Sequence, residues 1–159
     1  MTPHTWTYTE IVELLGQSPG PSSTGVVVGT SGSTGSPKRA RLSVGALTAS
    51  AHSTIEVLGG PGQWLLATPA THIAGIQVLV RSALAGIEPV VMEAGGFTAE
   101  RFAEAAGRLT HERTYVSLVP TQVQRLLDDP LGRSALARFS TVLVGGAAVP
   151  GTLRAAAAA

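Results

Sequence analysis

The sequence predicts an α/β fold, with a mainly parallel sheet flanked by helices. Short apolar runs alternate along the chain with stretches of helical periodicity, at the spacing typical of β–α–β units. Several of these runs are apolar at successive positions, as expected for strands that are buried on both faces. The chain has 159 residues and no internal repeat, which suits one domain with a real core.

The first elements have recognisable boundaries. Thr7-Tyr-Thr-Glu10 resembles a capping box and predicts a short helix. Residues 17–24 form a Pro/Ser/Gly-rich connector, and Gly25 to Gly29 is predicted to be a buried strand. A helix is expected from the capping residue Ser43 to Gly59-Gly60, because apolar residues recur there three and four positions apart.

The remaining elements alternate in order and follow the same signals. Helix starts are marked by Thr98 as a cap and by Pro120 as a first helical residue. The expected strands are residues 64–68, 88–92, 115–119 and 140–144. The expected helices are residues 74–85, 98–109 and 120–127, and a turn is expected over 128–132. We therefore divide the chain into an N-terminal helix and connector, residues 1–24, and a partial α/β domain, residues 25–159.

The segment Gly29-Thr-Ser-Gly-Ser-Thr-Gly-Ser-Pro-Lys38 is the strongest functional signal. Its glycines allow tight turns whose amides point into an anion site, its hydroxyls can donate hydrogen bonds, and Lys38 adds a positive charge. The alternative is a solvated linker, which the predicted strand before it and helix after it disfavour. The segment does not fit the nucleotide patterns G-x-x-x-x-G-K-[ST] and G-x-G-x-x-G or the hydrolase pattern G-x-S-x-G.

Thr30 to Lys38 matches the phosphate loop T-S-G-[ST]-T-G-x-P-K of the adenylate-forming superfamily at every position. The chain thus resembles acyl-CoA synthetases, luciferases and peptide-synthetase adenylation domains, and in particular their large N-terminal domain. The resemblance implies that the loop binds the β- and γ-phosphates of ATP while a carboxylate attacks the α-phosphate, with Lys38 as a catalytic residue. The cofactor-binding residues that it implies in the loop are Thr30, Ser31, Gly32, Ser33, Thr34, Gly35 and Lys38.

Four segments follow the ends of predicted strands. They are the phosphate loop, Pro69 to His72, Pro120-Thr121 and Gly145 to Ala147. Ligands of open α/β sheets bind beyond the carboxyl edge, so we expect these segments to form one composite site.

Two of these segments match further motifs of the superfamily. Pro69-Ala-Thr-His72 followed by Gly75 fits P-x-x-H, whose histidine borders the acyl pocket near the reacting carboxylate. The resemblance implies that His72 is a second catalytic residue that orients the carboxylate; a structural histidine is the alternative. Gly145-Gly146-Ala147 fits G-G-[AE], where the backbone passes close to adenine, although a plain strand-to-helix turn would look the same.

Residues 72–82, 118–122 and 142–147 resemble the o-succinylbenzoate–CoA ligases of actinobacteria, which belong to menaquinone synthesis. This resemblance implies an acid–CoA ligase that uses ATP, Mg²⁺ and coenzyme A and forms an acyl-adenylate, then an acyl-CoA. The substrate contacts that we expect are Thr71, His72, Arg81 and Thr121. For Arg81, a solvated surface charge is the favoured alternative. Another aryl- or acyl-CoA synthetase, or a non-catalytic phosphate- or nucleotide-binding module, remains the alternative function.

Members of the superfamily are considerably longer than this chain. The chain ends inside the helix expected after Pro150, in a run of alanines. This run is either a native helix or not part of the native sequence. The chain also contains no Y-G-x-[ST]-E motif. The resemblance therefore implies a fragment that is inactive alone, with the glutamate that binds Mg²⁺ and the small C-terminal domain beyond its end. We accordingly assign no metal ligand within the chain.

Composition excludes several classes of protein. A formal net charge of +1 gives no basic field for nucleic acid. The absence of cysteine excludes disulfides, a thiol nucleophile and a zinc–thiolate site, and it suits the reducing cytoplasm. We find no signal peptide and no stretch long enough to span a membrane. We expect a soluble cytoplasmic protein whose small-molecule partners are a carboxylic acid, ATP and coenzyme A; its oligomeric state cannot be predicted.

Overall fold

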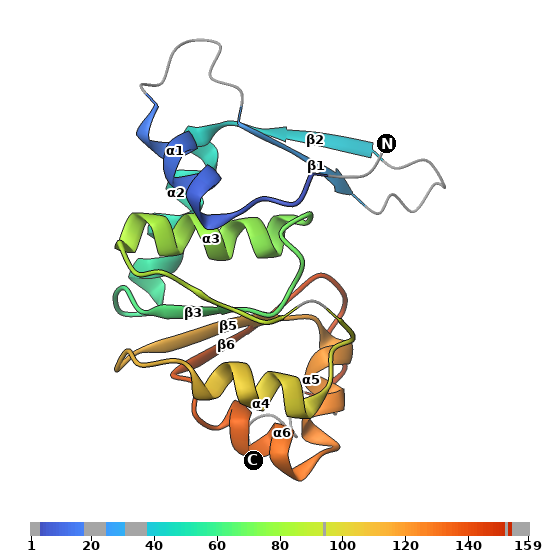
Figure 1. The fold of residues 1–159 in the computed structure, drawn as a ribbon. Coiled ribbons are helices and arrows are strands. Elements are labelled where there is room, and N and C mark those ends of the chain that lie inside the picture. The colour runs from blue at the N-terminus through green and yellow to red at the C-terminus, as the bar shows by residue number, and fades with distance from the viewer. Residues whose placement is uncertain (1–3, 18–24, 31–37, 94, 152, 154–159) are drawn as a thin grey trace.

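The computed structural model describes residues 4–17, 25–30, 38–93, 95–151 and 153, and it shows the predicted α/β architecture (Figure 1). Its centre is a four-stranded parallel sheet. The strands are β3 (Gln63–Leu66), β4 (Val90–Val91), β5 (Thr114–Leu118) and β6 (Thr141–Val144). Their order across the sheet is β4-β3-β5-β6. Parallel neighbours need crossover connections, which helices provide here.

Helices cover both faces of this sheet. They are α1 (Tyr8–Gly16), α2 (Val44–Val57), α3 (Ile73–Ala85), α4 (Ala99–Gly107), α5 (Pro120–Leu127) and α6 (Pro130–Leu136). Helix α3 lies on one face, with α1 and α2 packed against it, and α4, α5 and α6 lie on the other face (Figure 1). The chain steps from β3 to β4 in one direction and from β4 to β5 in the other, so right-handed crossovers place α3 and α4 on opposite faces.

Local signals set the helix starts as predicted. The side chain of Thr7 accepts from the amide of Glu10 at 3.3 Å, and the Glu10 carboxylate accepts from the amide of Thr7 at 2.8 Å, which confirms the capping box. Ser43 and Thr98 cap α2 and α4, and Pro120 is the first residue of α5. These interactions satisfy amides that a helix start leaves without partners.

The expected turn over residues 128–132 is partly wrong, because α6 begins at Pro130. The carboxylate of Asp129 accepts from the amides of Leu131 and Gly132 at 2.8 and 3.0 Å and caps this helix. Asp and Pro favour turns, but they also favour the cap and first position of a helix. The same residues thus serve both structures, and local composition does not separate them.

The segment before the phosphate loop also differs from the prediction. β1 (Val26–Thr30) pairs with β2 (Lys38–Leu42), a strand that the sequence analysis did not predict, in a separate antiparallel ribbon. β1 is therefore not a strand of the parallel sheet. Val26 and Val28 are buried whereas Val27 is 43% exposed, so only one face of β1 meets the core. Three consecutive valines conceal this alternation, because nothing polar marks the outer position.

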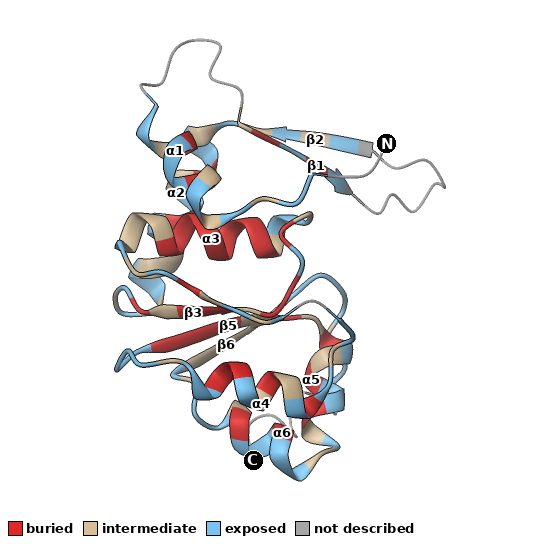
Figure 2. Ribbon diagram, in the orientation of Figure 1, coloured by how far each residue is buried: buried red, intermediate tan, exposed pale blue. Residues whose placement is uncertain are grey.

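Buried residues form two main cores, one on each side of the pair of layers made by α3 and the sheet; Figure 2 colours the buried segments red. One core joins the sheet to α4, α5 and α6 and includes Leu65, Phe102, Val116, Leu118 and Leu126. The other joins α3 to α1, α2 and the ribbon and includes Ile11, Val26, Leu47, Ile76 and Leu79. Trp64, Val78 and Tyr115 connect the sheet to α3. Among the described helices, none is both long and apolar enough to cross a membrane.

Candidate functional site

The chain reverses its direction across the sheet between β3 and β5. β4 lies on one side of β3, and β5 lies on the other. Ligands of open α/β sheets bind in the crevice at such a switch point. The ladder between β3 and β5 ends at the pair Leu65–Val116, whereas the ladder between β5 and β6 continues to Leu118–Val144. The sheet therefore opens between β3 and β5 at its carboxyl edge.

His72 lies on one side of this opening, where α3 begins. Its backbone is extended, and its amide donates to the carbonyl of Pro69 at 3.2 Å, which closes the turn from β3 into α3. The side chain is exposed and does not cap the helix. Amides at a helix N-terminus favour negative charge nearby, so an imidazole here can orient a carboxylate. This role of His72 stays a prediction.

Gly75 allows α3 to approach the loop that carries His72. A Cβ at position 75 would lie 2.5 Å from the carbonyl oxygen of Pro69 and 2.8 Å from the nitrogen of Ala70. Both are backbone atoms, so relieving the overlap would displace the loop itself. The glycine that follows the P-x-x-H motif is thus required by close packing.

Two predicted substrate contacts, Thr71 and Thr121, also lie at this edge. Thr71 is half-buried in the turn between β3 and α3. Thr121 is exposed in the first turn of α5, directly after the buried Pro120. The two hydroxyls belong to the segments on either side of the opening, each close to a helix N-terminus. This is the arrangement that the sequence predicts for these positions, and their contact with a substrate stays a prediction.

Residues 145–147 pass along the same edge beside β5. The amide of Gly145 donates to the carbonyl of Leu118 at 3.1 Å. Gly146 has φ of +83°, and a Cβ there would lie 3.3 Å from Cγ1 of Val119. All three residues are exposed, so a flat ring could approach their backbone closely. The adenine contact remains a prediction.

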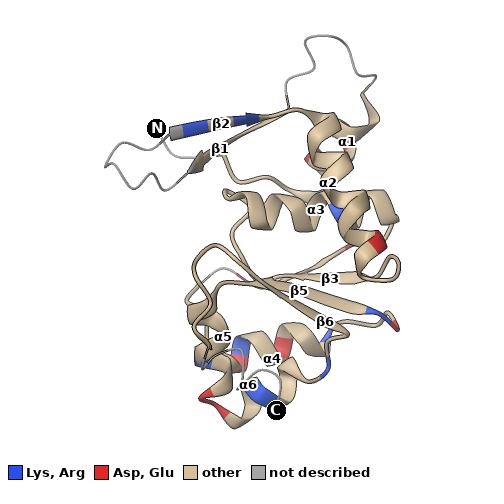
Figure 3. Ribbon diagram, turned by 180° about the vertical axis from the view of Figure 1, so that it is seen from behind, with Lys and Arg blue, Asp and Glu red and all other residues tan. Residues whose placement is uncertain are grey.

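The predicted phosphate loop is tied to the ribbon. Thr30 pairs with Lys38 in the antiparallel register, so β1 and β2 hold the two ends of the loop together. The loop residues Ser31, Gly32, Ser33, Thr34 and Gly35 lie outside the described residues. Basic residues run along β2, where Arg39 and Arg41 are exposed (Figure 3). Three segments rather than the expected four therefore follow strands of the parallel sheet.

The preferred interpretation of Arg81 as a solvated charge is wrong. Its side chain is only 8% exposed, and burial lowers its pKa to about 10. Its Nη2 donates to Oγ1 of Thr54 at 3.3 Å, and its guanidinium lies 5.0 Å from the ring centre of Trp64. Among the described residues no carboxylate pairs with it, and Nε has no hydrogen-bond partner. Arg81 lies nine positions after His72 along α3, about 13 Å along the helix axis.

A buried cation without a carboxylate partner should reduce stability. We expect Arg81→Met to raise the free energy of unfolding by about 1 kcal/mol, because desolvating the charge costs more than its two contacts return. Thr54 keeps its bond to the carbonyl of Ser50. Denaturant unfolding measures the change, with Arg138→Met as a control at an exposed position. A variant less stable than the wild type would show that the contacts with Trp64 and Thr54 outweigh desolvation.

One residue of the site was missed by sequence reasoning. Gln122, in the first turn of α5, accepts a hydrogen bond from the amide of Val119 at 3.0 Å and donates one to the carbonyl of Ala67 at 3.1 Å. Its side chain thus links the ends of β5 and β3. The first bond has a sequence signal, since Gln three residues after a helix cap is common. The second joins residues 55 positions apart and has none.

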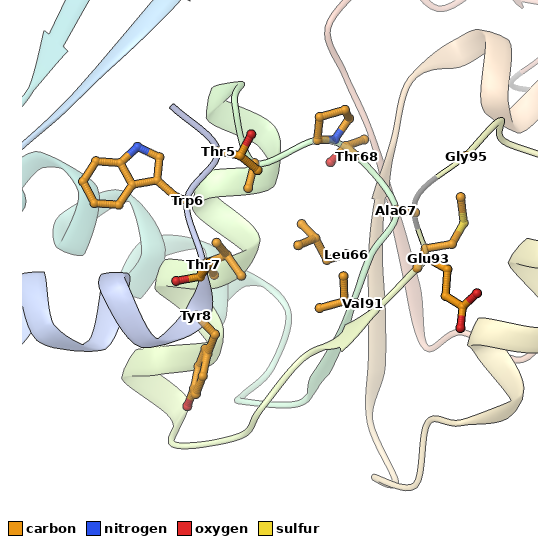
Figure 4. A pocket seen from close by; sticks show the side chains of 14 residues that line it. Thr5, Trp6, Thr7, Tyr8, Leu66, Ala67, Thr68, Val91, Glu93 and Gly95 are labelled. Carbon is orange, nitrogen blue, oxygen red and sulfur yellow. The ribbon is translucent and has the colours of Figure 1, made fainter. Parts of the chain in front are cut away.

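The N-terminal segment contributes a second unexpected feature. The amide of Trp6 donates to the carbonyl of Ala70 at 3.3 Å, in the loop that carries His72. Beside it, a cavity of about 510 Å³ lies between residues 5–8, the ends of β3 and β4, and Leu79 (Figure 4). Apolar side chains form much of its wall, including those of Leu66, Ala67, Val91 and Met92. Its size is in the range of small-molecule pockets, and its walls suit an apolar group.

Comparison with known proteins gives consistent matches. The profile of the AMP-binding enzyme family matches residues 6–159. The chain is 49% identical over 135 residues to a probable 2-succinylbenzoate–CoA ligase of Mycobacterium tuberculosis, covering 84% of the chain and 35% of that relative. It is 36% identical over 123 residues to the 2-succinylbenzoate–CoA ligase of Escherichia coli, covering 76% and 24%. The chain thus spans about a quarter to a third of the length of these relatives.

Solved structures agree with these matches. E. coli MenE with a bound analogue of OSB-AMS superposes with a TM-score of 0.68 at 28% identity, covering 87% of this chain and 28% of that one. The o-succinylbenzoate CoA synthetase of Bacillus subtilis, in complex with the acyl-adenylate intermediate OSB-AMP, gives 0.66 at 30% identity, covering 80% and 25%. In both, the likeness covers most of this chain and about a quarter of the other.

Proposed function

The chain belongs to the AMP-binding enzyme family, and on that premise we propose that it supplies part of the active site of an ATP-dependent acid–CoA ligase. The acid that we propose is 2-succinylbenzoate. The observation that carries this proposal is the 49% identity, over 84% of the chain, to a relative that bears this name. The positions of His72, Thr121 and Gly145 to Ala147 at one sheet edge support it, because they give that reaction a common site.

In the proposed reaction, a carboxylate oxygen attacks the α-phosphorus of ATP and the bond to pyrophosphate breaks. The thiol sulfur of coenzyme A then attacks the acyl carbon, its proton passes to solvent, the bond from the acyl carbon to the AMP oxygen breaks, and AMP leaves. We assign the phosphates to the loop and Lys38, the carboxylate to His72, and adenine to residues 145–147. Catalysis of this kind depends on alignment and on stabilising charge, with no proton to be removed from an ionised carboxylate. The absence of cysteine suits the cytoplasm, where we place the reaction.

Mg²⁺ would enter this site with ATP. The described part of the chain contains no group of three or more metal-ligating side chains that could hold a metal ion. Mg²⁺ prefers phosphate oxygens and water, with one or two carboxylates. We propose that its ligands include phosphate oxygens of ATP and water.

2-Succinylbenzoate has a second carboxylate, on its ring. We propose that the aliphatic carboxylate reacts beside His72, and that Thr71 and Thr121 contact the rest of the molecule. We also assign Arg81 to the second carboxylate, because its buried guanidinium has no carboxylate partner among the described residues. In the structure this guanidinium lies over the ring of Trp64.

A hybrid ligase tests the proposal. In this hybrid the chain replaces the segment that it matches in the M. tuberculosis relative, and formation of 2-succinylbenzoyl-CoA from the acid, ATP and coenzyme A is measured. We expect turnover within about tenfold of the parent, a barrier change below about 1.4 kcal/mol. Gly146→Val provides the inactive control, because its positive φ and the nearby Val119 exclude a branched side chain. A folded hybrid without acid-dependent pyrophosphate release would contradict the proposal.

A further inference from the structure

We propose that Gln122 is a positioning residue that sets the width of the crevice between β3 and β5. It would thereby hold Thr121 and the loop of His72 at the distance at which both can contact the acid. The inference rests on the proposed ligase function, because it assigns the crevice to the acid.

Gln122 bridges the place where the sheet opens. The last backbone pair between β3 and β5 is Leu65–Val116. Beyond it, the Gln122 amide donates to Ala67, two residues further along β3's path, and accepts from Val119, three residues further along β5's path. The side chain thus joins the two strands where their backbones no longer pair.

The capping role of Gln122 does not explain this link. Capping the start of α5 requires only an acceptor for the amide of Val119, and a glutamate would serve equally well. The donor to Ala67 is an additional feature, which a primary amide supplies because it accepts and donates from one planar group. Asparagine carries the same amide on a side chain that is one methylene shorter. An ionised carboxylate can only accept, so it cannot donate to Ala67.

Both partners of Gln122 adjoin the candidate site. Ala67 is two residues before Pro69, where the loop to His72 begins, and Val119 is two residues before Thr121. Val119 also lies against Gly146, since a Cβ there would be 3.3 Å from its Cγ1. Displacing Val119 would therefore move the contacts assigned to the acid and to adenine together. One amide holds three segments in a common arrangement.

The variant Gln122→Glu separates the two bonds. It keeps the acceptor that caps α5, but it places an ionised oxygen against the Ala67 carbonyl. In the hybrid ligase near pH 8 we expect kcat/KM for 2-succinylbenzoate to fall about tenfold, because a part-buried hydrogen bond is lost and two acceptors are left facing each other. The matched control is Gln124→Glu, two residues later on α5, where the exposed side chain bonds only to Asp128. We expect that control to stay within about twofold of the unmodified hybrid.

Low pH should restore the link in Gln122→Glu. A protonated carboxyl can donate to Ala67, and this contact raises the pKa of the new side chain above its usual value of about 4.3. The ratio of kcat/KM between Gln122→Glu and Gln124→Glu should therefore approach one as the pH falls from about 8 towards 5. Ionisation of the acid affects both variants alike, so it cancels in the ratio. A general loss of structure would not recover in this way.

Hydrogen exchange of the 159-residue chain tests the link without catalysis. The amides of Thr68 and of residues 70–72 should exchange faster in Gln122→Glu than in Gln124→Glu near pH 8. Equal kcat/KM for the two variants, a deficit that persists at low pH, or equal exchange would each overturn the inference. An unmodified hybrid that is inactive with every acid would instead refute the ligase function, and the exchange result would still decide whether Gln122 links the strands.

Discussion

We expect Lys38→Ala to lower the rate of acyl-adenylate formation in the hybrid ligase by about a hundredfold. A charge-assisted contact to a phosphate contributes about 1.5–3 kcal/mol, and removing a donor that acts on developing charge costs a similar amount. The ribbon fixes the place of this lysine, because Lys38 pairs with Thr30 at the base of the loop. The measurement is pyrophosphate exchange at saturating ATP and acid.

Arg39 provides the matched control for this variant. It follows Lys38 on β2, is exposed and carries the same charge, but it stands outside the loop motif. Arg39→Ala should leave the exchange rate within about threefold, because solvent screens an exposed charge. Both variants should keep their free energies of unfolding within about 0.5 kcal/mol of the parent. Equal losses of rate in the two variants would reduce the role of Lys38 to general electrostatic attraction.

The parallel part of the fold follows from local signals. Four of the predicted helices carry their own cap or a proline start, as Thr7, Ser43, Thr98 and Pro120 show. Helix α3 has no side-chain cap, and its apolar periodicity predicted it instead. The ribbon could not be predicted in this way. A run of valines fits a parallel strand and an antiparallel one equally well, and the pairing of β1 with β2 depends on how the chain turns between them.

The site residues also differ in whether local sequence reveals them. His72 and Gly145 to Ala147 lie in short motifs, so their places at strand ends could be found from sequence. Gln122 and Arg81 could not be understood, because their environments come from distant segments: Ala67 for the first, Thr54 and Trp64 for the second. To predict that Arg81 is buried, one would need to know that α2 and the sheet both pack against α3. Charge at a helical position indicates exposure only when nothing packs over that position.

Substrate choice should show a larger effect than any single substitution. We expect the hybrid ligase to prefer 2-succinylbenzoate over benzoate, coumarate and a medium-chain fatty acid by at least about a thousandfold in kcat/KM. The reason is that polar groups assigned to the second carboxylate lose their partner when a monocarboxylic acid binds. Leaving such groups desolvated and unpaired costs more than any lost apolar contact. Parallel assays with the four acids measure the preference.

Arg81→Met makes this last prediction more specific. If the buried guanidinium binds the second carboxylate, the variant should be more stable and less selective than the unmodified hybrid. The ratio of kcat/KM for 2-succinylbenzoate to kcat/KM for benzoate should then fall by about a factor of ten or more. If the guanidinium stays on Trp64 during the reaction, stability changes and the preference does not. Comparable kcat/KM for benzoate in the unmodified hybrid would refute 2-succinylbenzoate as the acid. Membership of the AMP-binding enzyme family would be unaffected, because it rests on the match over residues 6–159.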